Sequence, residues 1–126
     1  MHGYIEFPSD AKNIFKDIIQ DYNLKVVSES SSEIIFKSNN CIIEIMTEYD
    51  YVQFYFKQSE NEKWMFLGPF LEAVYPNENI IIQKSPENLN RVEKIRFNLK
   101  KELGLIKKYC VPILTGDFSW KHKYQV

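Results

Sequence analysis

Few side chains in this chain are of the types that carry catalysis or bind metals. The two histidines, His2 and His122, lie near opposite ends of the sequence, although histidine is the usual acid–base group at neutral pH. The two cysteines, Cys41 and Cys110, lie far apart and form neither a disulfide framework nor a metal-ligand cluster. We interpret the histidines as solvated terminal side chains and the cysteines as reduced core residues. The sequence therefore predicts no metal site, no cofactor and no catalytic residues.

The remaining candidate for catalysis is a group of three acids, Glu44, Glu48 and Asp50. Carboxylates can act as general acid and base where a pocket raises the pKa of one of them. Acids on an exposed strand are more often simply solvated, and the four scattered glycines form no phosphate-binding loop. We therefore expect a protein that is not an enzyme, and keep a small enzyme using these acids as the second alternative.

Three lysines, Lys94, Lys101 and Lys108, recur every seven residues and would form a basic stripe along a helix. Such a stripe could contact a nucleic-acid backbone. A lysine-rich solvent face is also common on amphipathic helices, and the pI of the chain is only about 6.1. A nucleic-acid-associated regulator that uses this stripe is thus the first alternative, and not the main expectation.

Composition and charge limit the class of protein. With 126 residues, 44% of them hydrophobic, the chain fits one domain, 1–126, with a single packed core. No apolar run approaches the roughly 20 residues of a membrane helix, and the N-terminus lacks the features of a cleaved secretion signal. We therefore expect a cytoplasmic protein that does not enter a membrane.

The charge of the chain is unevenly distributed. Residues 1–82 carry a net charge of −7 and residues 83–126 one of +6, which sum to the −1 of the chain. As the explanation of this asymmetry, we favour a basic helix that lies against an acidic sheet.

Hydrophobic periodicity predicts a helix followed by an antiparallel meander. Apolar residues three and four positions apart indicate a helix capped by Ser9 or Asp10 that ends near Asn23. After it, short runs of β-branched and aromatic residues alternate with polar turns, as is typical of strands. With residues 39–40 and 49–50 as two-residue loops, residues that face one another share a side of the sheet. The inner face is then uniformly apolar and consists of Ile34, Phe36, Ile43, Ile45, Val52, Phe54 and Phe56.

The outer face of the same strands is mixed. It includes Glu44, Met46, Glu48, Tyr51 and Tyr55, which is the amphipathic mixture that protein interfaces use. Coverage of this face by a terminal segment or a short helix is an equally good interpretation. We take the five residues as the candidate partner-binding surface.

The second half of the chain is expected to be mainly helical. A fifth strand is predicted over residues 64–67 and a short helix from Pro69 to Val74. The predicted fold class is α+β, with an antiparallel meander of about four to five strands. One face of the sheet packs against the N-terminal helix and a long, broken C-terminal helix.

Several residues set the expected limits of the long helix. Ser85 followed by Pro86 is a typical helix start. Gly104 could end a first helix, and Pro112 would lose a backbone hydrogen bond within a second one. We expect one helix from Pro86 to about Leu103 and a distorted one to about Leu114.

The chain then continues through Gly116-Asp117-Phe118-Ser119-Trp120. With the order of the elements, the run over residues 113–120 resembles small bacterial immunity-like proteins of polymorphic or contact-dependent toxin systems, whose helices end in a similar I-L-x-G-D-F-x-W run. The resemblance implies a non-enzymatic protein-binding module that binds and neutralises a cognate toxin. It implies no binding residues, because these vary with the toxin. The matching positions Gly116, Asp117, Phe118 and Trp120 are expected to be structural.

Overall fold

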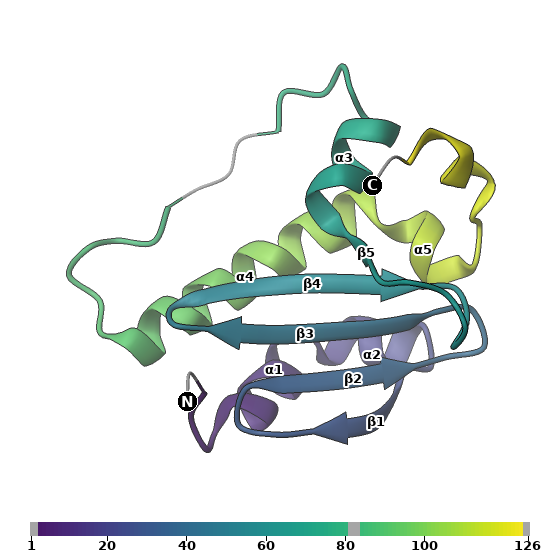
Figure 1. Ribbon diagram of the computed structural model, residues 1–126. Helices are drawn as coiled ribbons and strands as arrows, with labels where there is room; N and C mark the ends of the chain where they lie inside the picture. Colours follow the sequence, from purple (N-terminus) through teal and green to yellow (C-terminus); the bar gives the residue numbers. More distant parts are fainter. Residues whose placement is uncertain (1–2, 81–83, 125–126) are drawn as a thin grey trace.

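A computed structural model describes residues 3–80 and 84–124 and has an α+β fold (Figure 1). Its five-stranded antiparallel sheet is a meander in the order β1-β2-β3-β4-β5, which confirms the predicted fold class. The strands are β1 Lys25–Glu29, β2 Glu33–Lys37, β3 Ile42–Glu48, β4 Tyr51–Lys57 and β5 Met65–Phe66. The helices are α1 Phe7–Ile14, α2 Lys16–Asp21, α3 Leu67–Val74, α4 Arg91–Tyr109 and α5 Val111–Thr115, followed by a 3-10 helix Ser119–Lys123.

The predicted register of the central strands is confirmed. Ile34 faces Ile45, and Ile45 in turn faces Phe54. The polar pairs at residues 39–40 and 49–50 form the turns, and Tyr49 adopts a φ of 58° there. All seven predicted inner-face residues are buried, together with Thr47.

The core lies between this inner face and the helices. Phe56 packs edge-on against Phe70 of α3, with ring centroids 5.6 Å apart, and Phe70 packs against Trp120 at 4.7 Å. Ile95 and Leu99 of α4 are fully buried behind the sheet. Aromatic pairs of this geometry add specificity to the burial of apolar area.

The predicted N-terminal helix is wrong in two respects. It begins at Phe7, before the expected cap, because Pro8 fits the first turn of a helix. It is also interrupted at Phe15, between α1 and α2. The apolar spacing runs through this break because Phe15 is buried on the same side as Ala11 and Ile18.

The predicted limits of the long helix are also wrong. The start is at Asn90, whose side chain accepts from the backbone N–H of Glu93 while the Glu93 carboxylate accepts from that of Asn90. This capping box satisfies two backbone donors at once, so Pro86 lies in the preceding loop. Gly104 lies within α4, since helical glycine costs only about 1 kcal/mol. The break comes at Cys110, just before Pro112 of α5.

The observed limits of the fifth strand and of α3 also differ from the predicted ones. The fifth strand spans only Met65–Phe66, and α3 begins at Leu67 instead of Pro69. Gly116 ends α5 in the left-handed conformation, with a φ of 83°. Asp117 accepts hydrogen bonds from the backbone and the side chain of Ser119, and Trp120 is buried. This closing run therefore holds the C-terminal segment on the core.

Candidate protein-binding surface on the outer face of the sheet

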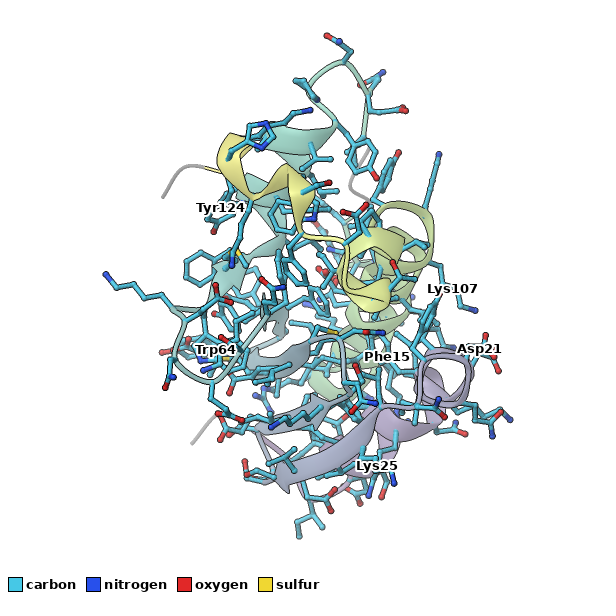
Figure 2. All side chains as sticks on the ribbon, turned by 90° about the vertical axis from the view of Figure 1, so that its right-hand side faces the viewer. Phe15, Asp21, Lys25, Trp64, Lys107 and Tyr124 are labelled. Atoms are coloured by element: carbon cyan, nitrogen blue, oxygen red, sulfur yellow. The ribbon has the colours of Figure 1, made fainter. Side chains whose placement is uncertain are left out.

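The helices of the described chain lie on one side of the sheet. Figure 1 shows α1, α2 and α4 behind it, and Figure 2 shows Phe15 and Asp21 on the helical side with Trp64 on the opposite side. Within residues 3–80 and 84–124, no helix or strand packs over the outer face. The strand positions on this face include Glu33, Ile35, Lys37, Ile42, Glu44, Met46, Glu48, Tyr51, Gln53, Tyr55, Lys57 and Phe66.

At one end of the outer face, the loop after β4 contacts two lysines. Lys37 Nζ lies 3.4 Å from the Glu60 carboxylate. Lys57 Nζ lies 4.4 Å from the centre of the Trp64 ring and donates to the Glu60 carbonyl. Ile42, between the two lysines, is only 4% exposed. The loop after β4 therefore supplies a partner to each of the two lysines at this end.

The other end is acidic and open. Glu44 faces Tyr55, and Glu48 faces Tyr51 on the adjacent strand. Tyr51 is 65% exposed, and Glu48 is exposed beside it. We call the residues Glu33, Glu44, Met46, Glu48, Tyr51 and Tyr55 the acidic surface. The structure thus brings together all five predicted contact residues and adds Glu33, which faces Met46.

The carboxylates of Glu33, Glu44 and Glu48 form no ion pair with the other described residues. The reason is that the basic helix α4 lies behind the sheet, where its cations pair with acids of α1, of α2 and of the turn after β3. These ion pairs are Arg96 with Asp10 at 2.8 Å, Lys107 with Asp17 at 3.6 Å and Lys94 with Asp50 at 3.7 Å. The sheet itself therefore separates the acidic surface from the main basic element.

Crowding of the acids changes their protonation. Partial burial, together with hydrogen bonding to and repulsion from Glu33, raises the pKa of Glu44 to about 7. Partial burial and the charges of Glu44 and Glu48 also raise the pKa of Tyr55. A cation brought to this surface would relieve the repulsion and favour ionised Glu44.

The structure divides the acids considered for catalysis. Asp50 is drawn toward α4, because its carboxylate pairs with Lys94 and its carbonyl accepts from Asn98 at 2.7 Å. Glu44 and Glu48 remain on the open sheet face. Neither of them lines any of the five cavities that we compared among the described residues. This arrangement does not enclose a substrate between the three acids.

The histidines and cysteines are not clustered either. His122 is exposed and its Nδ1 lies 2.8 Å from the carbonyl oxygen of Ser119, whereas His2 lies outside the described residues. Cys41 and Cys110 are buried free thiols. No group of three or more His, Cys, Asp or Glu side chains in the described part of the chain is placed to hold a metal ion.

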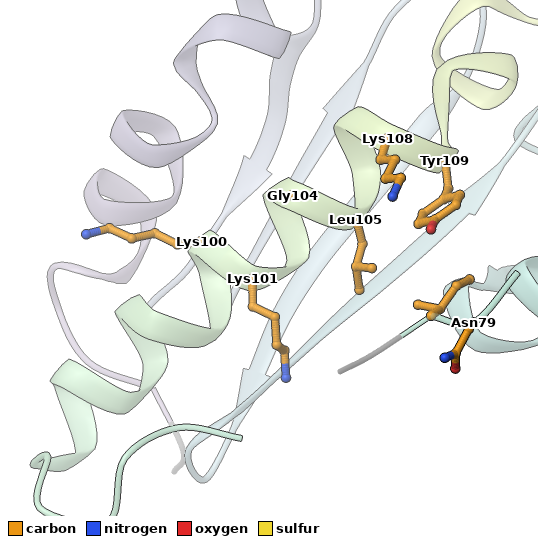
Figure 3. Close-up of a pocket in the computed structure, with 8 residues that line it drawn as sticks. Asn79, Lys100, Lys101, Gly104, Leu105, Lys108 and Tyr109 are labelled. Carbon is orange, nitrogen blue, oxygen red and sulfur yellow. The ribbon is translucent and has the colours of Figure 1, made fainter. Parts of the chain in front are cut away.

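The three lysines of the predicted stripe, Lys94, Lys101 and Lys108, all lie on the continuous helix α4. Lys101 and Lys108 line a cavity of about 530 Å³ beside α4, but Lys94 is engaged by Asp50. Figure 3 shows Lys100 and Lys101 projecting in different directions, and Lys108 lies over the ring of Tyr109. These cations do not converge on one point.

Glu102 is a candidate site residue that the sequence prediction missed. It lies on the buried side of α4, three positions after Leu99 and four before Ile106. It lines a cavity of about 270 Å³ together with Phe54 and Leu71. The sequence did contain a signal for this site, because Glu102 occupies a position where the helical spacing calls for an apolar residue. A carboxylate at such a position must either be paired or face a cavity.

No described helix is both long enough and apolar enough to cross a bilayer. Comparisons of the chain with protein-family models, with curated proteins and with solved structures find no match.

Proposed function

We propose that this protein is a non-enzymatic, immunity-like protein that binds and neutralises a bacterial toxin through its acidic surface. The observation that carries the proposal is a sheet face on which the carboxylates of Glu44 and Glu48 form no ion pair with described residues and lie near the exposed ring of Tyr51. Tyrosine is enriched among the residues that dominate binding energy at protein interfaces.

The charge of the surface specifies the chemistry of the partner. Three carboxylates that form no ion pair with other described residues are complementary to lysine and arginine side chains, and complementary charge accelerates encounter and discriminates against acidic partners. A toxin domain that acts on nucleic acid carries such a basic face. Binding there would cover the face with which the toxin holds its substrate. We place this interaction in the cytoplasm.

A growth experiment tests the proposal. The toxin domain encoded by the neighbouring gene is expressed in a susceptible bacterial host, alone or with this protein. We expect the protein to restore growth and Glu48→Lys to reduce protection, because the substitution places a cation against the basic partner. The matched control is Glu72→Lys, an equal charge reversal at an exposed acid of α3, which should leave protection intact.

Two outcomes contradict the proposal. One is the absence of a toxin gene beside this gene together with no protection against any toxin of the same cell. The other is protection that Glu48→Lys and Glu72→Lys affect equally, because this would remove the acidic surface from the interaction.

A further inference from the structure

The edge of β4 is only partly occupied. β5 pairs with β4 at Tyr55 and Phe56 alone. Among the described residues, no strand lies beside the preceding part of β4, Tyr51–Phe54, and Figure 1 shows this edge running free from the turn after β3 to β5. An open strand edge offers backbone donors and acceptors to another chain.

The backbone groups of Val52 and Phe54 point toward this open edge. Thr47 donates its backbone N–H to Ser32 on the β2 side, at 2.8 Å, and Thr47 faces Val52 in the register of β3 and β4. Residues that face one another in an antiparallel pair exchange either both of their backbone hydrogen bonds or neither. Val52 therefore directs its N–H and C=O away from β3, and Phe54, two positions later, does the same.

A cavity of about 270 Å³ lies along this edge, between β4, the start of α3 and α4. Its lining is mostly apolar and includes Phe54, Leu71 and Leu105, and Glu102 is its one charged side chain. No hydrogen bond or ion pair joins Glu102 to another described residue. Burial raises the pKa of Glu102 to about 7, because the opposing effect of the Lys101 charge is weaker.

We propose that the open edge of β4 receives an extended segment of the protein partner by strand addition, with a lysine or arginine of that segment placed in the cavity against Glu102. The segment would pair with Val52 and Phe54. Side chains that face one another across two strands lie on the same side of a sheet, so the partner residue opposite Phe54 would project to the side where Glu102 lies.

The charge of the cavity selects the occupant. An apolar side chain would leave the Glu102 carboxylate buried without a partner, whereas a cation would pair with it. The other edge strand, β1, is a poorer acceptor because a bulge between Val26 and Ser28 interrupts its pairing. The inference rests on the proposed function only in requiring a protein partner, and it concerns a surface separate from Glu44 and Glu48.

A peptide titration of the full-length protein tests the inference. The probe is an acetylated, amidated heptapeptide, Thr-Val-Thr-Arg-Thr-Val-Thr, and its twin has glutamine in place of arginine. Amide NMR spectra are recorded at about pH 8, where Glu102 is ionised. We expect slowed exchange at the amides of Val52 and Phe54, with Gln53 unchanged because it already pairs with β3. Glu102→Gln should weaken binding of the arginine peptide about tenfold, and Glu72→Gln should not.

The outcomes separate this inference from the proposed function. The inference is overturned if the Val52 and Phe54 amides do not respond to either peptide at about 5 mM, or if both peptides bind equally to the protein and to Glu102→Gln. If the arginine peptide binds but no toxin partner is found, the inference is supported and only the toxin proposal is contradicted. A toxin complex in which these two amides exchange as in the free protein would overturn the inference alone.

Discussion

Replacing Glu102 with glutamine should stabilise the protein at alkaline pH. Burial raises the pKa of this carboxyl from 4.5 to about 7 in the folded state. Below about pH 4.5 the group is protonated in both the folded and the unfolded chain, so its ionisation costs nothing. As the pH rises from 4.5 to 7 the unfolded chain loses the proton first, and the folded state loses stability. Glutamine resembles the protonated carboxyl and avoids this loss.

The magnitude follows from the two pKa values. A tenfold change in an acid dissociation constant corresponds to about 1.4 kcal/mol, so the difference between 4.5 and about 7 corresponds to about 3 kcal/mol above pH 7. Because Glu102 is only partly buried, this value is an upper limit. At about pH 5 the same comparison should give about 1 kcal/mol or less.

Urea unfolding measures both values. The free energies of unfolding of the native protein, Glu102→Gln and Glu72→Gln are compared at about pH 5 and about pH 8. Glu72 is exposed on α3 and serves as the matched control. Equal stability of the native protein and Glu102→Gln at the higher pH would refute the conclusion that partial burial without an ion pair raises the pKa of Glu102.

Three further predictions concern the core, the C-terminal run and the acidic surface. Phe56→Ala should lower the free energy of unfolding by about 3–5 kcal/mol, because Phe56 is fully buried against Phe70; a loss below about 1 kcal/mol on denaturant titration would contradict this packing. Gly116→Ala should cost about 1–2 kcal/mol by the same measurement, since its φ is 83° and a Cβ would lie 3.0 Å from Asn40 Oδ1; an unchanged midpoint would speak against this conformation. Affinity for a basic protein partner, measured by calorimetry, should rise from about pH 6 to about pH 8, because a bound cation lowers the pKa of Glu44 from its free value of about 7 and favours the ionised form; affinity that falls over this range would exclude ionised Glu44 as a contact.

The sheet could be predicted because its signals are local. Two-residue polar turns and an alternation of apolar and polar residues specify one register, and a slip by one position would bury Glu44 and expose Ile45. The five contact residues were placed on one face by the same alternation. Whether that face is open could not be predicted, because it depends on where the helices of the second half pack.

The helix limits were mispredicted where two local signals competed. Ser85-Pro86 is a valid helix start, but the reciprocal hydrogen bonds of Asn90 and Glu93 form the observed one. Gly104 was expected to end a helix, yet buried Leu99 and Ile106 on either side hold α4 together through it. Tertiary packing of this kind outweighs the propensity of one residue.

The site at Glu102 could be predicted only in part, because one of its features is local and the other is not. Its spacing from Leu99 and Ile106 was readable in the sequence, but the cavity that it lines is also formed by residues of β4, β5 and α3. The free edge beside it is a product of the short β5. Such a site is defined by segments far apart in the chain.

The central claim is that the acidic surface binds the partner. It is tested most directly with the proposed partner, a toxin domain encoded beside this gene. The dissociation constant is measured for the native chain and for Tyr51→Ala combined with Glu48→Lys. Both side chains are exposed, so the double variant should retain its fold. We predict an affinity about a hundredfold weaker for the double variant. An unchanged dissociation constant with the fold intact would contradict the claim.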